Sequence, residues 1–213
     1  MRDKNLRYFE CEMRASVEDG KHILRGTPIV FEEHTLIWEY WDEVIHRGAL
    51  DGANLKDMCL FVNHNGDNIA LARSKNGKGT LKYNIDDVGM HIEADLDVEN
   101  NTDARALWSA VERGDMSGMS FAFRIEKDGG ETWTDVKNAT EPPYAYREIN
   151  KISIVHEVSV VNYPAYEATS VSTRSKSEEE TLAKLKEMRE ERSRKAERDL
   201  ELEKLKIQIR SKL

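Results

Sequence analysis

The sequence predicts a mainly β protein with packed helices, an α+β fold, that continues into a charged helical tail. Short alternating or β-branched runs recur through residues 1–174 and are separated by turns that contain Gly, Asn and Asp. Residues 101–113 have the helical period instead. From residue 175 the chain has no Gly or Pro and is dense in Glu, Lys, Arg and Leu, which are strong helix formers. We therefore predict a body of residues 1–174 and a tail of residues 175–213.

The predicted strands of the body form a largely antiparallel sheet that is curled or closed into a barrel. Loops such as SKNGKG (74–79) and DDVG (86–89) are short, which is typical of a meander. The segments that predict strands are LRYFECEMRA (6–15), HILRGTPIVF (22–31), MCLFV (58–62), IALAR (69–73), LKYNI (81–85), MHIEADL (90–96), MSFAFRI (119–125) and KISIVHEVSVV (151–161).

One helix is predicted within the body, in the segment NTDARALWSAVERGD. Asn101 or Thr102 can cap its start, and Gly114 ends it. Its apolar residues fall at i, i+3, i+4 and i+7, so one face is buried against the sheet. These residues are Ala104, Leu107, Trp108 and Val111.

The tail is nearly balanced in charge, whereas the body is acidic. The tail holds 12 basic and 10 acidic residues out of 32 and 40, so its net charge is +2 and that of the body is −10. Leu182, Leu185 and Met188 lie on one helical face, but the apolar spacing then lapses until Leu200, which does not support a continuous coiled coil. The tail is predicted either to be a solvated helix or to dock on a partner or a second copy.

Composition excludes several classes of protein. The net charge of −8 argues against a nucleic-acid partner. No apolar run approaches a membrane span, and the first 15 residues lack the apolar core of a signal peptide, so we expect a protein that is not secreted. Cys11 and Cys59 form no CxxC pair and predict buried free thiols. No zinc-ligand spacing occurs, and we expect neither metal nor cofactor.

Two serines lie three residues apart in GDMSGMSFAFRI (114–125), just after the predicted helix. Strand alternation places Met119, Phe121, Phe123 and Ile125 on one face and Ser120 on the other, whereas Ser117 lies in the preceding turn. A serine hydroxyl attacks only when a base takes its proton. By periodicity alone, neither serine is distinguished as a nucleophile.

Among the six histidines, His64 stands out as a candidate base. His64 follows a predicted strand within NHNG, and such loop ends commonly present functional groups. His156 is in phase with Ile152, Ile154, Val158 and Val160, which places it on the apolar face of its strand. Its neighbour Glu157 points the other way with Ser153 and Ser159, and a carboxylate there would need a partner, such as an imidazole that it orients.

Four segments, in this order, resemble sequence elements of the prohead serine proteases of tailed bacteriophages. They are EVIHRGAL (43–50), FVNHN (61–65), GDMSGMSFAF (114–123) and HEVSVVNYPAYEATSV (156–171). The resemblance implies that Ser120 is the nucleophile, His64 the general base and Glu157 the third member of a triad, with Ser117 as the alternative nucleophile. The chain departs from the family pattern at Asn65, where an Asp is usual, and at Ala122, where a Gly is usual.

The family is thought to share its fold with the herpesvirus assembly proteases, a small β-barrel ringed by helices. Those relatives use a second histidine as the third member, so His156 is the alternative to Glu157. The backbone N–H groups near Gly118–Ser120 are candidate oxyanion donors, and Arg124 or Arg147 could assist them. Trp38 and Trp41 belong either to the core or to the wall of a substrate groove.

By this resemblance the protein is a serine endopeptidase of capsid maturation, acting in the host cytoplasm inside the assembling prohead. Its expected partners are the major capsid protein with its scaffold region, and itself, with autocleavage near residues 170–180. The sequence is also compatible with a homo-oligomer. The competing hypothesis is a catalytically silent capsid-assembly or scaffold protein that acts through its helical tail.

Overall fold

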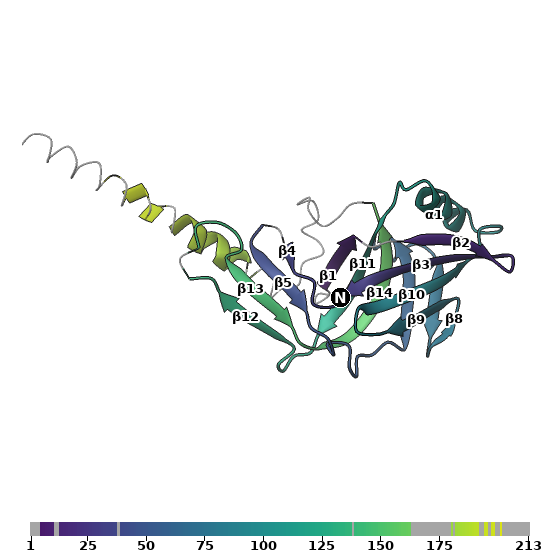
Figure 1. Ribbon diagram of the computed structural model, residues 1–213, viewed down its shortest axis with the longest axis horizontal. Coiled ribbons are helices and arrows are strands. Elements are labelled where there is room, and N and C mark those ends of the chain that lie inside the picture. Colours follow the sequence, from purple (N-terminus) through teal and green to yellow (C-terminus); the bar gives the residue numbers. More distant parts are fainter. Residues whose placement is uncertain are drawn as a thin grey trace, which may run out of the picture.

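The computed structural model describes residues 5–10, 13–37, 39–137 and 139–162, together with residues 180, 182–191, 194–195, 197–198 and 201 of the tail. Side chains are described from residue 13 onward. Three sheets and two helices make up this part of the chain (Figure 1). No helix among the described residues is long and apolar enough to cross a membrane.

The largest sheet has six strands in the order β1-β11-β14-β6-β7-β8. Neighbours in it are antiparallel except β14 and β6, which run parallel. Parallel pairing needs a long crossover, and the whole of the chain between β6 and β14 supplies it. The strands are β1 (Asn5–Glu10), β6 (Asp57–Val62), β7 (Ala72–Lys75), β8 (Lys78–Gly79), β11 (Gly118–Ile125) and β14 (Ile152–Val161).

A second sheet, the facing sheet, packs against one side of the six-stranded sheet in the order β2-β3-β10-β9. Its strands are β2 (Arg14–Glu18), β3 (Lys21–Val30), β9 (Leu81–Ile85) and β10 (Gly89–Leu96). The main hydrophobic core lies between the two sheets, where Leu24 and Met90 meet Phe121 and Val158. Because the strands alternate, each sheet gives one row of side chains to this core and leaves the other row outside.

The helix α1 (Thr102–Glu112) covers one end of this core beside β2 (Figure 1). Asn101 caps it by accepting hydrogen bonds from the backbone N–H groups of Asp103 and Ala104, and Gly114, at φ +77°, ends it. All four predicted apolar residues are buried. The indole of Trp108 meets the ring of His22 edge to face, with the ring centroids 4.8 Å apart. The predicted helix is confirmed.

A third sheet, the side sheet, was not predicted. Its order is β12-β13-β5-β4, and its central pair, β5 and β13, is parallel. The strands are β4 (Thr35–Ile37), β5 (Trp41–Ile45), β12 (Glu131–Asp135) and β13 (Ala145–Ile149). They are short and carry buried charge, so no alternating apolar pattern indicates them.

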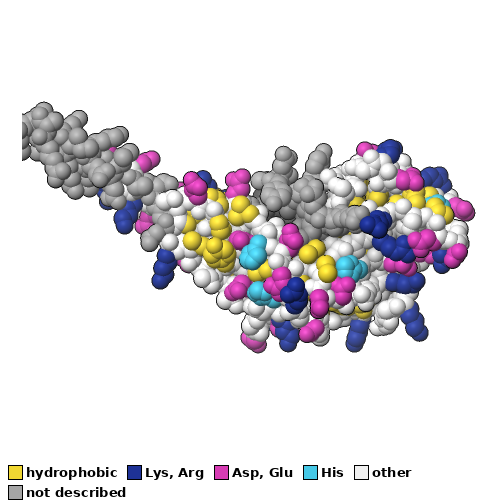
Figure 2. Space-filling model, in the orientation of Figure 1, with side chains coloured by type: hydrophobic (Ala, Val, Ile, Leu, Met, Phe, Trp, Pro, Cys, Tyr) yellow, Lys and Arg dark blue, Asp and Glu magenta, His cyan; other side chains and the backbone are white. Residues whose placement is uncertain are grey.

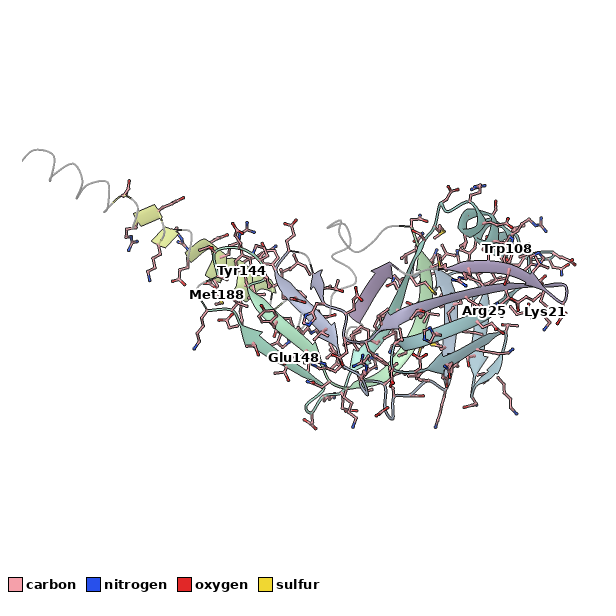
Figure 3. The ribbon with its side chains drawn as sticks, in the orientation of Figure 1. Lys21, Arg25, Trp108, Tyr144, Glu148 and Met188 are labelled. Atoms are coloured by element: carbon pink, nitrogen blue, oxygen red, sulfur yellow. The ribbon has the colours of Figure 1, made fainter. Side chains whose placement is uncertain are left out.

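The tail helix packs on the side sheet rather than standing free. Leu182 and Leu185 are buried against Trp41 and Tyr144, and Met188 lies beside Tyr144 (Figure 3). The three residues of the predicted apolar face thus lie in one cluster with the side sheet. Trp41 is completely buried in this second core, so it does not form a groove wall, whereas Trp38 lies outside the described residues.

The prediction of a closed barrel is wrong, because the sheets of the described chain do not join into one. At the two places where they approach, β7 comes near β9 and β1 comes near β3, but no ladder of hydrogen bonds connects these pairs. A barrel needs an uninterrupted ladder around its circumference. The predicted strand over residues 6–15 is also divided, since β1 and β2 belong to different sheets.

Candidate active site

The candidate site lies on the outer face of the six-stranded sheet, opposite the core. Met119, Phe121 and Phe123 of β11 point into the core, so Ser120 points outward, as the alternation predicts. Ser120 pairs across the ladder with Ser159 of β14, and Ser159 in turn pairs with Phe61 of β6. Directly paired residues share a face, so these three side chains form one outward row.

A second outward row runs parallel to the first, one step further along the strands. It consists of Ala122, Glu157 and Cys59, which are paired in the same way. Glu157 therefore lies diagonally beside Ser120 on the same face. The chain brings the predicted nucleophile and the predicted third member together through a strand pair that is 37 residues apart in sequence.

The predicted phase of β14 holds at Ile152 but is wrong for residues 154–156, because the strand contains two bulges. The ladder shifts between Ala122 and Phe123, where His156 is the extra residue, and again between Arg124 and Ile125. Val155 therefore enters the core in place of Ile154, and His156 is not part of the apolar row. A bulge adds a residue to one strand and bends it, and such bulges are common beside active sites.

The loop after β6 carries His64 back over β14. Asn63 and His64 both have left-handed backbone, at φ +50° and +58°, which Asn and His adopt more readily than most residues. Three hydrogen bonds hold this turn: the Asn63 N–H donates to the Val160 carbonyl, the Asn162 N–H donates to the Asn63 Oδ1, and the His64 N–H donates to the Ser159 Oγ. These bonds offset a backbone strain of about 1–2 kcal/mol per residue.

The imidazole of His64 bridges Ser120 and Glu157. Its Nε2 lies 2.7 Å from the Ser120 Oγ, and its Nδ1 lies 2.6 Å from the Glu157 Oε1. An ionised carboxylate only accepts hydrogen bonds, so Nδ1 carries the proton and Nε2 is left to accept the serine hydroxyl. That is the tautomer in which a histidine can act as a base toward a serine.

Ser159 ties the carboxylate and the histidine backbone together, and the sequence did not predict this role. Its hydroxyl donates to the Glu157 Oε2 at 2.7 Å and accepts from the His64 N–H at 3.2 Å. Its side chain is fully buried. The one available indication was its position two residues after Glu157, which places both on the same face of β14.

The other residues considered for catalysis are less well placed than Ser120. Ser117 is exposed in the turn before β11, while both ring nitrogens of His64 contact other residues. Gly118–Ser120 pair with β1 on one side and β14 on the other, which does not favour their amides as oxyanion donors. Arg124 is exposed, four residues along β11 from Ser120.

Arg147 belongs to the side sheet and is fully buried there. Its guanidinium contacts the Glu43 carboxylate at 3.0 Å and the Glu131 carboxylate at 2.6 Å, and it lies over the ring of Trp133. Because Glu43 and Arg147 are paired in the parallel ladder, this ion pair joins β5 to β13. The glutamate of EVIHRGAL is therefore a structural residue, and Arg147 does not serve the site.

The comparison with protein families decides what kind of protein presents this arrangement. The model of the caudovirus prohead serine protease family matches residues 9–184, which is most of the chain. The chain belongs to this family. No curated protein and no solved structure matches it. The match reaches past residue 174, the predicted end of the body, into the tail helix that packs on the side sheet.

The prohead protease chain departs from the family pattern at two positions that the structure accommodates. Asn65 follows the histidine, and its Oδ1 accepts a hydrogen bond from the Asp67 N–H, a turn that an Asp in that position would also make. Ala122 lies in the outward row beside Glu157 and is almost fully buried. Neither difference changes an atom that contacts the His64 ring.

Cys59 lies beside this site, because it pairs with Glu157 across the ladder. Burial raises the pKa of the Cys59 thiol, the Arg73 guanidinium opposes this shift, and the carboxylates of Asp57 and Glu157 add to it. The side chain is a free, half-buried thiol, and Cys11 lies outside the described residues. A thiol with a raised pKa is rarely ionised at neutral pH, so Cys59 is a poor competing nucleophile.

Proposed function

We propose that this prohead protease is a serine endopeptidase with Ser120 as nucleophile, His64 as general base and Glu157 as the group that orients His64. The observation that carries this proposal is the continuous chain of contacts from the Ser120 Oγ through both nitrogens of His64 to Glu157, at 2.7 and 2.6 Å. Ser120 lies on β11, Glu157 on β14 and His64 in the loop after β6, so their proximity does not follow from local sequence.

The mechanism follows from this geometry. His64 Nε2 takes the proton of Ser120 as its oxygen attacks the substrate carbonyl, and the resulting imidazolium then gives the proton to the leaving amine. Glu157 stabilises the charged ring and fixes its tautomer, and Ser159 holds Glu157 in place. The acyl-enzyme is then hydrolysed by water, which His64 activates in the same way.

The substrates proposed for the enzyme are the scaffold region of the major capsid protein and the enzyme itself. This rests on membership of the prohead protease family. The proposed autocleavage region near residues 170–180 falls mostly outside the described residues. Because Leu182 and Leu185 are buried against the body, these two residues are not available to pair with a scaffold helix.

The test uses a small fluorophosphonate, which labels activated serines, and cleavage of co-expressed major capsid protein. We expect the wild type to be labelled on Ser120, and Ser120→Ala to lose both labelling and cleavage, while the matched control Ser117→Ala keeps both. Glu157→Gln should lower the rate of cleavage by about 10³-fold or more, whereas His156→Gln should change it little.

Two outcomes would contradict this proposal. Trimming of the capsid protein by Ser120→Ala at the same bonds would remove Ser120 as the nucleophile. An unlabelled wild type that leaves capsid protein intact would favour the silent assembly protein instead.

A further inference from the structure

A cavity beside the candidate triad has no part in the chemistry proposed above. It has a volume of about 330 Å³ and lies between α1, the end of β6 and the loop that follows β6. Its lining is mostly apolar. The residues around it are Phe61, Val62, Asn68, Ile69, Leu71, Asp103, Ala106, Leu107, Ala110 and Met116.

The cavity exists because α1 presents small side chains to it. Asp103, Ala106 and Ala110 follow one another at helical spacing, next to the stripe that α1 buries in the core. Ala106 is exposed and Ala110 half-buried, so the space above them is open to solvent. Across the cavity, Ile69 is 78% exposed, so its aliphatic side chain is accessible at the rim.

The walls of the cavity are continuous with the elements that hold the triad. The loop that carries His64 also supplies Asn68 and Ile69, and Met116 lies just before β11, which carries Ser120. Ser120 is only 3% exposed, while the His64 side chain is 20% exposed, so a substrate reaches the hydroxyl from the His64 side. The loop that carries His64 therefore also forms one wall of the cavity.

Strand register gives the lateral backbone spacing between Ser120 and Phe61, one of the residues that line the cavity. Ser120, Ser159 and Phe61 form one outward row across three adjacent strands. Two strand spacings are about 10 Å. An extended peptide covers that span with about three residues. A substrate whose scissile bond lies at Ser120 therefore brings a side chain about three residues away to the cavity.

We propose that this cavity is the site where the enzyme recognises a large aliphatic side chain of its substrate, about three residues from the cleaved bond. The inference rests on the proposed protease function and adds its specificity. The lining offers dispersion contacts and few polar groups to desolvate, which suits an apolar side chain. Burying such a side chain contributes about ten- to hundredfold in kcat/KM.

The test fills the cavity from α1. Ala106→Leu and Ala110→Leu put a good helix former at a half-buried or exposed site, so both variants should fold. The matched control is Glu112→Leu, at an exposed position of the same helix outside the cavity. Cleavage of a peptide library is read by mass spectrometry, and labelling of Ser120 by the small fluorophosphonate is measured alongside as a check on the triad.

The wild type and Glu112→Leu should prefer a large aliphatic residue at one position about three residues from the cleaved bond. Ala106→Leu and Ala110→Leu should lose this preference. Their kcat/KM for such peptides should be about ten- to hundredfold lower, while labelling of Ser120 stays unchanged. The assignment is overturned if labelled wild type shows no aliphatic preference there, or if the filled variants keep it. An unlabelled wild type would instead contradict the protease function itself.

Discussion

At the scale of single residues, Ser159 connects two members of the candidate triad. Its hydroxyl donates to the Glu157 carboxylate and accepts from the His64 backbone N–H, and its backbone pairs with Ser120 in the ladder. With its one proton donated to Glu157, its oxygen remains free to accept the His64 N–H. We therefore regard Ser159 as a positioning residue for the triad.

Ser159→Ala should lower kcat by about tenfold or more and leave KM nearly unchanged, because the change loosens His64 and Glu157 without removing a substrate contact. The matched control is Ser153→Ala on the same strand, whose hydroxyl donates to the backbone carbonyl of Arg124, away from the triad. Steady-state kinetics measures both variants. If the two lower the melting temperature alike and leave kcat alike, Ser159 has only a structural role.

At the scale of elements, the tail helix is part of the folded body over its first turns. Leu185 is 4% exposed, and together with Leu182 it covers Trp41 of β5 and Tyr144, the residue before β13. Figure 2 shows hydrophobic side chains gathered at this end of the molecule. Lys186 and Arg189 add cation–π contacts to Tyr40 at 5.9 Å. The helix thus supplies the apolar cover that a four-stranded sheet lacks by itself.

Leu185→Asp should release the tail helix, because a carboxylate cannot be buried against Trp41 without a partner. We expect acrylamide to quench tryptophan fluorescence more strongly and the melting temperature to fall by several degrees, about 2 °C or more per kcal/mol lost. Glu187→Asp, at an exposed position of the same helix, should change neither. Equal quenching in both variants would mean that the helix does not depend on this contact.

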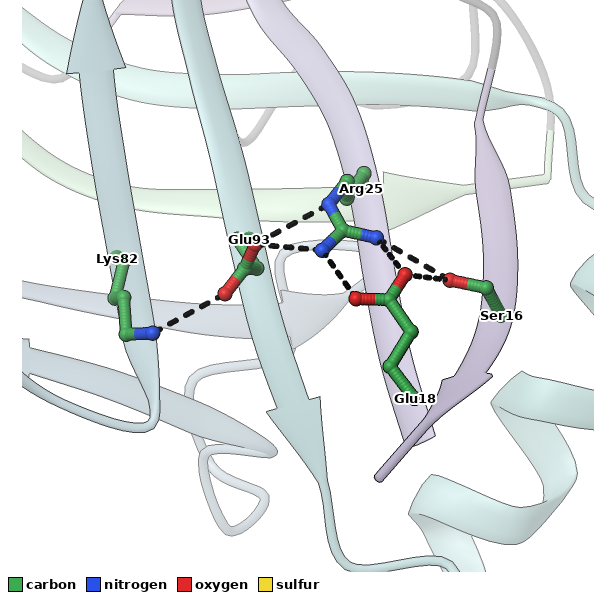
Figure 4. A network of polar contacts seen from close by, with 5 residues as sticks. All are labelled: Ser16, Glu18, Arg25, Lys82 and Glu93. Atoms are coloured by element: carbon green, nitrogen blue, oxygen red, sulfur yellow. Dashed lines mark hydrogen bonds and ion pairs between the residues drawn. The ribbon is translucent and has the colours of Figure 1, made fainter. Parts of the chain in front are cut away.

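At the scale of the whole molecule, exposed ion pairs cross the outer surface of the facing sheet. Arg25 of β3 lies between Glu18 of β2 and Glu93 of β10, and Lys82 of β9 joins Glu93 from the far side (Figure 4). The hydrogen bond from Arg25 lowers the pKa of Glu18 to about 2, and the hydrogen bond from Ser16 makes a smaller contribution in the same direction. The same guanidinium and Lys82 lower the pKa of Glu93. One network thus spans all four strands.

This network predicts how acid acts on the fold. A carboxyl whose pKa is lower in the folded chain stabilises it above the unfolded pKa, about 4.3, and this contribution is lost as the pH falls toward the folded value of about 2 for Glu18. Glu18→Gln should lower the melting temperature by about 1–2 °C at pH 7, and the difference should shrink below pH 4.5. Glu112→Gln is the control, and a difference that stays constant with pH would contradict the assignment.

The sequence by itself determined the elements whose residues repeat with one clear period. Helix α1, the strand that points Ser120 away from the core and the long β-branched strand β14 all follow from local patterns. Motif resemblance named the family, which the family comparison confirmed, and it named Ser120, His64 and Glu157 as candidates. These patterns are local, so they can be read from neighbouring residues.

Only the tertiary structure decided what depends on strand pairing between distant segments. The bulge at His156 changes the phase of β14, and it is visible only in the register with β11. The parallel pairing of β5 and β13 around Glu43 and Arg147 joins segments about 100 residues apart and leaves no local period. Three other features also depend on contacts between separate elements: the role of Ser159, the cavity beside α1 and the covering of Trp41 by the tail. Such contacts cannot be read from the spacing of residues along a single strand or helix.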